Sequence, residues 1–308
     1  MKVFVTGATG FVGRHILARL KEDGHIISVL VRPGSEKNLP FIEGIGLVTG
    51  DIMDPSVWAK SLNNIDAVIH LTGIIREFPA NEITFENLHF EATRNIVESA
   101  KAANVKRFIH MSANGASPNG VSEYQTTKWR AEKLVTESSM AWTIFRPSVI
   151  FGNAGAGMEF TAQIAKIISM APVMPVFGDG EYMLEPVAVP DVADCFVKAL
   201  TESSAENKTF HLGCGTPLTY NEIIQIIGKA VGKIRTPTIK IPFGLIEPVV
   251  RALGKFKSFP VTVDQLNILK AGNTCPEHDF VGVFNVKPTE FTYKNLPHLA
   301  LFKKKRRG

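Results

Sequence analysis

The chain opens with Met1-Lys-Val-Phe-Val-Thr-Gly-Ala-Thr-Gly-Phe-Val-Gly13, a β-branched and aromatic run that breaks into glycines. An amphipathic helical pattern follows at once, which predicts a strand, a tight turn and a helix N-terminus. Gly7 allows the turn, Gly10 lets a ligand approach the backbone, and Gly13 lets the helix pack on the strand. The helix N-terminus attracts an anion. A dinucleotide pyrophosphate binds at such a turn, and a purely structural turn is the alternative.

Charge and cysteine content limit the class of protein. The net charge of +5 is matched by the five cations of Lys303–Arg307, so the rest of the chain is neutral and no nucleic-acid partner is expected. This basic tail is typical of a solvated end, with contact to an anionic membrane or a partner as the alternative. Cys195, Cys214 and Cys275 match no metal or disulfide pattern, and we find no signal peptide and no long apolar run. We expect a cytoplasmic protein without a metal site, of undetermined oligomeric state.

Strand and helix patterns alternate through the first two-thirds of the chain. Buried strands are predicted at Lys2–Thr6, Ile26–Val31, Gly46–Val48, Ala67–Thr72, Arg107–Ser112 and Thr143–Ile150. Helices are predicted at Phe11–Glu22, Pro55–Leu62, Thr84–Ala103 and Tyr124–Ser138. This alternation predicts an α/β fold with a doubly wound parallel sheet, in which ligands bind at the carboxyl ends of the strands.

Beyond residue 150 the pattern becomes loop-rich. Further elements are predicted at Asp191–Leu200, Thr209–Leu212, Asn221–Val231, Phe243–Leu253 and Thr262–Lys270. We expect a dinucleotide-binding Rossmann domain over 1–150, a smaller substrate lobe over 151–302 that is partly interleaved with the sheet, and a basic tail over 303–308. Apolar residues alternate with cations over Phe243–Phe259. Packing within its own domain is the ordinary interpretation of that segment, and contact with a membrane surface or a lipophilic substrate is the alternative.

The strand ends predict which dinucleotide binds. Arg32 follows the second strand, where an acidic residue would select NAD, and its guanidinium suits the 2′-phosphate of NADP(H). Asp51 follows the third strand and could bind the adenine amino group. The expected cofactor contacts are Gly7, Thr9, Gly10, Phe11, Val12, Gly13, Arg32, Asp51, Ile52, Leu71, Thr72, Gly73, Lys128, Pro147 and Val149.

Tyr124 and Lys128 stand four residues apart on one predicted helix and therefore share a face. A phenol is a poor base at neutral pH, but a neighbouring ammonium favours its phenolate. Ser112 ends the preceding strand, where it could polarise a substrate oxygen that Tyr124 protonates. The alternative is that Tyr124 and Lys128 are an ordinary exposed pair, four residues apart on a helix surface.

These motifs carry a resemblance. The chain resembles the extended and atypical short-chain dehydrogenase/reductases, which include nucleotide-sugar epimerases. The residues that carry this resemblance are the Thr6–Gly13 turn, Gly50-Asp51, Ser112, the Tyr124/Lys128 pair and Arg146-Pro-Ser-Val-Ile-Phe-Gly152. Within this group the chain looks most like the branch that contains the Rossmann-type accessory subunit of mitochondrial complex I and its bacterial relatives. This resemblance is carried by Trp142–Gly152, Pro190-Asp-Val-Ala193 and Pro260–Leu266. The resemblance covers nearly the whole chain except the tail.

The resemblance implies that Tyr124 is the catalytic acid–base, that Lys128 binds the nicotinamide ribose, and that the Arg146–Val149 segment lines the nicotinamide pocket. This chain departs from the pattern at His89, where many relatives carry asparagine. His89 is either a member of a proton relay or, as we favour, a satisfied core histidine. The chain also lacks the Tyr-Gly step that epimerases show after their serine.

Three functions remain open at this point. We expect an NADP(H)-dependent oxidoreductase that acts on a carbonyl or alcohol, with Ser112, Tyr124 and Lys128 as catalytic residues. The first alternative is a non-catalytic protein that holds NADP(H) as a structural or redox-sensing ligand in a complex, for which a respiratory complex is one candidate. The second is a nucleotide-sugar epimerase or dehydratase. The substrate itself is not readable from the chain.

Overall fold

The computed structural model describes residues 1–155, 159–254, 259 and 261–303. The chain forms two compact units and crosses between them more than once. The first unit comprises Met1–Pro147, Pro190–Leu212 and Glu277–Lys287, and the second comprises Ser148–Val189, Gly213–Pro276 and Pro288–Gly308. The expected domains over 1–150 and 151–302 are functional divisions and stay predictions. Most of the basic tail, like Lys255 and Lys257, lies outside the described residues.

Within the described part of the first unit, seven parallel strands form one sheet in the order β11-β6-β5-β4-β1-β2-β3. The strands are β1 (Lys2–Thr6), β2 (Ile26–Val31), β3 (Ile45–Thr49), β4 (Ala67–His70), β5 (Arg107–Met111), β6 (Ala141–Pro147) and β11 (Lys208–Leu212). The central strands β1, β4 and β5 are buried along nearly their whole length because helices cover both of their faces. The predicted α/β class with a doubly wound parallel sheet is confirmed.

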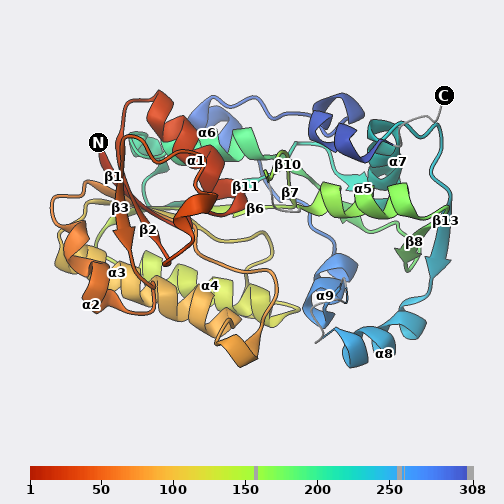
Figure 1. The fold of residues 1–308 in the computed structure, drawn as a ribbon, viewed down its shortest axis with the longest axis horizontal. Helices are drawn as coiled ribbons and strands as arrows, with labels where there is room; N and C mark the ends of the chain where they lie inside the picture. Colours follow the sequence, from red (N-terminus) through yellow and green to blue (C-terminus); the bar gives the residue numbers. More distant parts are fainter. Residues whose placement is uncertain (156–158, 255–258, 260, 304–308) are drawn as a thin grey trace. The chain divides into compact units, whose positions relative to one another are not determined.

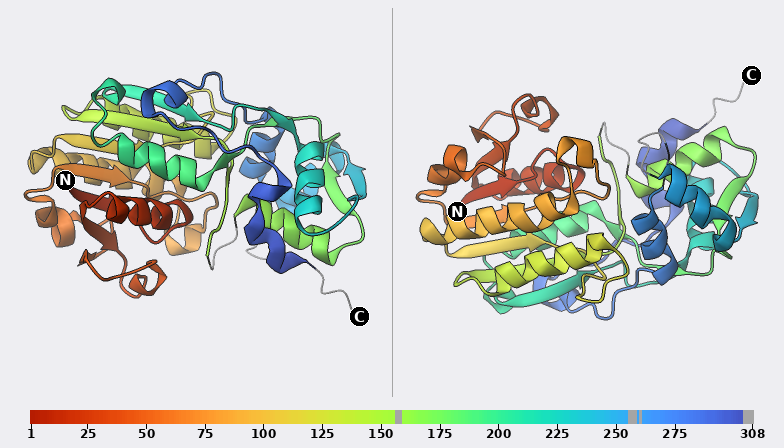
Figure 2. Two further views of the ribbon diagram at one scale, coloured as in Figure 1. Left: turned by 90° about the horizontal axis from the view of Figure 1, so that it is seen from above. Right: turned by 90° about the horizontal axis from the view of Figure 1, so that it is seen from below.

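Helices cover the two faces of this sheet (Figure 1). The helices of the first unit are α1 (Phe11–Glu22), α2 (Pro55–Trp58), α3 (Ala92–Ala102), α4 (Glu123–Thr136), α6 (Val189–Lys198) and α10 (Phe280–Phe284). Helices α1 and α6 lie on one face, and α2, α3 and α4 lie on the other, as the views from above and below in Figure 2 also show. Phe4, Trp58 and Phe108 are fully buried beneath the second group of helices, where apolar burial supplies the main stabilisation.

Strand β1 is the point at which the strand order reverses. The chain runs from β1 outward to β2 and β3 on one side, and then from β4 outward to β5, β6 and β11 on the other. In register, Thr6 lies beside His70, and His70 lies beside His110. The loops after β1 and β4 therefore emerge side by side at the carboxyl edge, which is where open α/β sheets bind their ligands.

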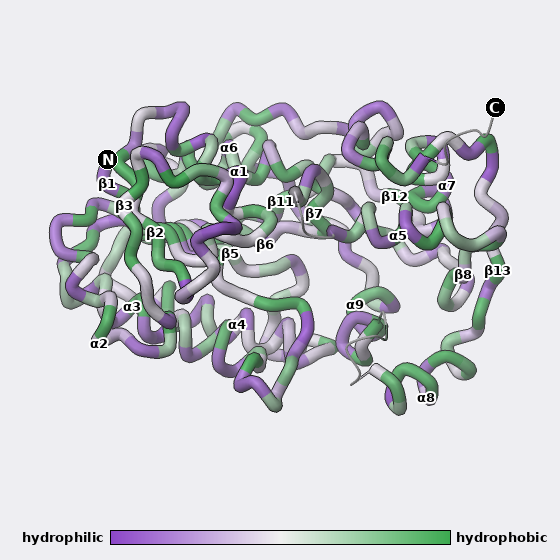
Figure 3. Tube along the Cα trace, viewed as in Figure 1, coloured by the Kyte–Doolittle hydropathy of each residue, from purple (hydrophilic) through white to green (hydrophobic). Residues whose placement is uncertain are grey.

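The second unit is built from short strand pairs and helices. Its elements are β7 (Ile150–Phe151), α5 (Phe160–Met170), β8 (Met174–Phe177), β9 (Met183–Leu184), β10 (Val187–Ala188), β12 (Leu218–Thr219), α7 (Tyr220–Ala230), β13 (Thr238–Ile241), α8 (Phe243–Leu253) and α9 (Val263–Ala271). Ile223, Ile224 and Ile227 of α7 pack in its core with Ile164 and Ile168 of α5. Helix α8 is predominantly apolar, as the hydropathy colouring of Figure 3 shows. Among the described residues, none of the helices combines the length and the apolarity needed to cross a membrane.

Three predicted elements are divided in the structure. The predicted helix over Pro55–Leu62 is α2, which ends at Trp58, followed by the 3-10 helix η2 (Ala59–Leu62). The predicted strand over Thr143–Ile150 is two strands, because β6 ends at Pro147 and β7 begins at Ile150. The predicted helix over Thr84–Ala103 is a π-helix, η4 (Glu86–Glu91), followed by α3. The short 3-10 helices are η1 (Glu36–Asn38), η2 (Ala59–Leu62), η3 (Pro79–Asn81), η5 (Ser203–Ala205), η6 (Tyr293–Asn295) and η7 (Pro297–Phe302).

Candidate functional site

The glycine turn after β1 is packed differently at each of its three glycines. Gly7 has φ +72°, and a Cβ there would lie 2.8 Å from the backbone carbon of Leu71. A Cβ on Gly13 would lie 2.4 Å from the carbonyl oxygen of Gly7, so only glycine lets α1 approach the turn. A Cβ on Gly10 would meet nothing nearer than that same oxygen at 3.2 Å. Packing within the protein thus requires glycine at positions 7 and 13. At Gly10, by contrast, the space on the side where a Cβ would lie, here called its outer side, is otherwise free of atoms from the described residues.

The N-terminus of α1 lies at this turn. Gly10 is the N-cap, and because it has no side chain it cannot cap the N–H groups of the first turn. Thr9, Phe11 and Val12 are partly buried beside it. An anion placed at this helix N-terminus would be bound by N–H groups and by the helix dipole.

The ends of β2 and β3 carry Arg32 and Asp51. Arg32 is exposed immediately after β2, the strand beside β1, where its guanidinium is accessible to a ligand. Asp51 is exposed after β3, and its Oδ1 accepts a hydrogen bond of 2.9 Å from the N–H of Met53. Asp51 therefore stabilises the turn that follows β3. Ile52 is buried behind it.

The end of β4 meets the predicted lysine. Leu71 and Thr72 back directly against Gly7, and a Cβ on Gly73 would lie 2.9 Å from the Nζ of Lys128. That ammonium donates a hydrogen bond of 3.0 Å to the carbonyl oxygen of Met111 at the end of β5. The structure therefore brings Lys128 to the carboxyl ends of β4 and β5, within the part of the fold where dinucleotides bind.

Burial controls the ionisation of the Tyr124/Lys128 pair. Lys128 is 4% exposed, and burial lowers its pKa to about 8, although the Glu132 carboxylate opposes this shift. Burial raises the pKa of Tyr124 to about 12. The direction for Tyr124 is opposite to the expected lowering by Lys128, because burial disfavours the charged phenolate. Tyr124 is a protonated acid at neutral pH in this site.

Ser112 has an unsatisfied hydroxyl. Its backbone N–H donates to the carbonyl of Phe145 over 2.8 Å, which fixes it next to β6. Its side chain is buried, yet among the described residues its Oγ has no hydrogen-bond partner. A buried hydroxyl without a partner costs stability, so such a group in a native site commonly binds a ligand or a water.

The segment after β6 is divided between the units. Arg146 forms a two-point ion pair with Glu132 of α4, at 2.8 and 2.5 Å. Pro147 ends the first unit, and its carbonyl accepts a hydrogen bond of 3.0 Å from Asn114. Val149 belongs to the second unit, where its carbonyl binds the N–H of Val187 over 3.0 Å. The predicted role of Pro147 and Val149 in the nicotinamide pocket stays a prediction.

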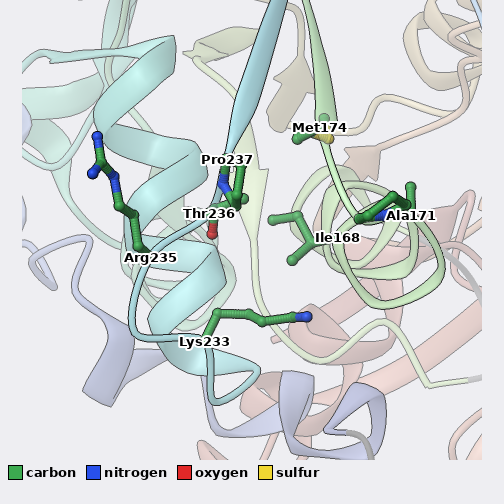
Figure 4. Close-up of a pocket in the computed structure, with 8 residues that line it drawn as sticks. Ile168, Ala171, Met174, Lys233, Arg235, Thr236 and Pro237 are labelled. Atoms are coloured by element: carbon green, nitrogen blue, oxygen red, sulfur yellow. The ribbon is translucent and has the colours of Figure 1, made fainter.

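The second unit holds a small pocket of its own. Lys233, Arg235 and Thr236 line it together with Ile168, Ala171 and Met174. Its volume of about 10 Å³ is that of a single water molecule, and Figure 4 shows the Arg235 guanidinium pointing away from Ile168 and Ala171. This pocket is too small for a substrate.

Sequence reasoning missed the residues that lie between the predicted ones. Thr127 and Ile74 both bind the ring of His89. Lys128 lies against Gly73 and Met111. A threonine inside the Tyr124-Gln-Thr-Thr-Lys128 motif was visible in the sequence, but its partner lies 38 residues away. Only the packed structure shows that contact.

Comparison with known proteins identifies the family. The NAD dependent epimerase/dehydratase family matches residues 3–213, and this chain belongs to it. It is 27% identical to the mitochondrial NADH-ubiquinone oxidoreductase 40 kDa subunit of Neurospora crassa, over 83% of this chain and 67% of that protein. It is 31% identical to a ceramide reductase of Caulobacter vibrioides, over 56% of this chain and 53% of that protein. The chain thus spans about two-thirds or less of the length of these relatives.

A solved structure agrees on the fold. MoeE5 in complex with UDP-glucose and NAD superimposes with a TM-score of 0.76 at 18% identity, covering 98% of this chain and 99% of that one. The predicted membership of the extended short-chain dehydrogenase/reductases, with relatives in complex I, is confirmed. The family binds a nicotinamide dinucleotide.

The residues of this chain fit such a dinucleotide. The outer side of Gly10 is free for a phosphate at the N-terminus of α1, and the absence of a side chain at Gly73 lets the Lys128 ammonium lie against the backbone at the end of β4. The Ser112 hydroxyl, which has no hydrogen-bond partner among the described residues, lies at the end of the adjacent strand β5. These three features lie at the carboxyl edge of one sheet, in the first unit.

Proposed function

We propose that this chain is an NADP(H)-dependent oxidoreductase that interconverts a carbonyl and an alcohol. The observation that carries the proposal is the buried Lys128 ammonium, which lies against Gly73 and Met111 at the ends of two neighbouring strands. Met111 directly precedes Ser112, whose hydroxyl has no hydrogen-bond partner among the described residues. The reductase among the relatives supports this class of reaction. The exposed Arg32 supports the preference for NADP(H), because a guanidinium pairs with a 2′-phosphate.

In this mechanism each side chain has one task. The turn from Gly7 to Gly13 and the α1 N-terminus would hold the pyrophosphate, Asp51 the adenosine end, and Lys128 the nicotinamide ribose. The bound dinucleotide supplies or accepts the hydride. Ser112 donates a hydrogen bond to the substrate oxygen, and Tyr124 transfers its proton to the alkoxide as that oxygen gains charge. A phenol whose pKa is about 12 is fully protonated at neutral pH, which favours the reductive direction.

The test is Tyr124→Phe. We expect turnover of a carbonyl panel with NADPH to fall by about 10²–10⁴-fold, the usual contribution of a positioned acid. The dissociation constant for NADPH should change by less than about twofold, because the phenol hydroxyl does not hold the cofactor. Tyr293→Phe, at an exposed position (48%) of the second unit, is the matched control. A Tyr124→Phe enzyme with wild-type turnover would contradict the mechanism.

A second candidate function is supported by the fungal relative. That protein is a subunit of NADH-ubiquinone oxidoreductase, so a non-catalytic subunit that keeps NADP(H) as a fixed ligand is the rival proposal. An apolar row on α8 supports an association of this kind: Leu245 is 68% exposed, Val249 41% and Leu253 42%. An exposed apolar row of this kind is typical of a contact surface. The rate of cofactor exchange separates the two candidates.

A further inference from the structure

His89 lies among the residues of the candidate site, whereas the sequence alone favours its interpretation as a satisfied core histidine. It is fully buried in η4, the π-helical segment that precedes α3. π-Helical turns are rare and are often found at functional sites, because they turn a side chain away from its α-helical direction. The contacts of this ring therefore require an explanation.

Both ring nitrogens of His89 bind parts of the candidate site. Nδ1 lies 3.0 Å from the Oγ1 of Thr127, which stands on α4 between Tyr124 and Lys128. Nε2 lies 3.0 Å from the carbonyl oxygen of Ile74 and 3.2 Å from its N–H. Ile74 follows Gly73 at the end of β4. One imidazole thus links the helix of the Tyr124/Lys128 pair to the strand end that faces Gly7.

The same ring limits the orientation of Tyr124. The two rings meet edge to face, with centroids 5.2 Å apart and planes at 85°. Phe85 stacks on His89 at 5.1 Å and meets Tyr124 edge on at 5.7 Å. Such edge-to-face pairs are directional, so His89 and Phe85 together hold the phenol ring in one orientation.

A proton relay through His89 does not fit these contacts. The ring has no exposed surface, and both nitrogens already have partners within the protein. Burial, and next the Lys128 ammonium, lower the pKa of His89 to about 2, so the ring is neutral at any working pH. A group that neither titrates nor meets solvent cannot pass a proton to bulk water.

We propose that His89 is a positioning residue, which holds the Tyr124 ring and the carboxyl end of β4 in a single arrangement. The importance of this role for turnover rests on the proposed function of Tyr124. The arrangement itself is a property of the protein alone, and it can be measured without any substrate or cofactor.

The experiment is NMR of protein labelled with ¹³C at the tyrosine ring. The chain has four tyrosines, and all except Tyr124 lie in the second unit, so Tyr124→Phe assigns the signal. We expect His89→Leu to broaden or multiply the Tyr124 signal, which the lost ring current of the imidazole alone would not do, while the signals of Tyr182, Tyr220 and Tyr293 stay in place. His110→Leu is the matched control, because His110 is another fully buried histidine, on β5. It should leave the Tyr124 signal unchanged.

Thr127→Val provides a second route if His89→Leu does not fold. It removes the hydroxyl that binds Nδ1 and keeps the imidazole, and we expect it to change the Tyr124 signal in the same sense. An unchanged Tyr124 signal in a folded His89→Leu protein, or in Thr127→Val where the first does not fold, would overturn the proposal.

Kinetics then connect the arrangement to catalysis. A misplaced acid costs up to about 100-fold in rate, so we expect kcat to fall by roughly 10–100-fold in His89→Leu while the NADPH dissociation constant stays within about twofold. The pH–rate profile should keep its shape. Loss of an ionisation near neutral pH in His89→Leu would instead indicate a relay and would overturn the positioning role. If Tyr124→Phe retains full activity, the proposed function fails, while the NMR result still decides whether His89 positions the ring.

Discussion

Lys128 has a charged group where water cannot solvate it, and its ionisation is therefore coupled to folding. Burial lowers its pKa from 10.5 to about 8, so between these values the unfolded chain binds the proton more tightly than the folded one. The free energy of unfolding consequently gains a contribution as pH rises from about 8 toward 10.5, and the charged lysine costs stability at pH 7. Lys128→Met removes this dependence.

We expect the Lys128→Met protein to be more stable than the wild type at pH 7, and this advantage to shrink by about 2–3 kcal/mol at pH 10. Urea unfolding of both proteins at the two pH values, without cofactor, measures it. Lys133→Met, on the exposed side of the same helix, is the control and should show no such change. A stability difference for Lys128→Met that does not vary with pH would show that the ammonium is solvated.

At the scale of elements, the β1–α1 turn separates a requirement of the fold from a requirement of the ligand. A Cβ on Gly13 would lie 2.4 Å from the Gly7 oxygen, so Gly13→Ala should lower the free energy of unfolding by about 1–3 kcal/mol. Gly10 has an ordinary φ of −77° and an open outer side, so Gly10→Ala should cost less than about 1 kcal/mol. Its NADPH affinity should nevertheless fall by more than about tenfold, since the methyl group occupies the place of the phosphate.

Urea unfolding and NADPH fluorescence titration of the two variants measure this contrast. Each variant is the control for the other, because both add one methyl group within four residues. If Gly10→Ala binds NADPH as the wild type does, the pyrophosphate is not held at this turn.

The comparison of predicted and observed elements shows where local sequence is sufficient. β1, β2 and α1 have the predicted bounds, because glycines or polar residues end each apolar run. The π-helix before α3 was not predictable, since the geometry at His89 depends on contacts with residues 15 and 38 positions away. The unsatisfied hydroxyl of Ser112 was equally invisible, because a missing partner is a property of the packed structure. Motif spacing therefore predicts strand ends for the site, which stay predictions, but it does not show how the side chains there are held.

For the whole molecule, the exchange of bound nucleotide decides between the two candidate functions. A dehydrogenase must release its cofactor in every cycle, whereas a structural ligand or an epimerase cofactor stays bound. We expect NADP(H), identified by mass spectrometry on the purified protein, to exchange within seconds when followed by NADPH fluorescence.

Arg32→Ala should weaken NADPH binding by more than about tenfold and leave NADH binding unchanged, because only the 2′-phosphate needs the guanidinium. Stoichiometric nucleotide that does not exchange would favour the non-catalytic subunit, or an epimerase if a sugar-nucleotide panel is converted. Recovery of NAD(H) would show that Arg32 does not select the cofactor.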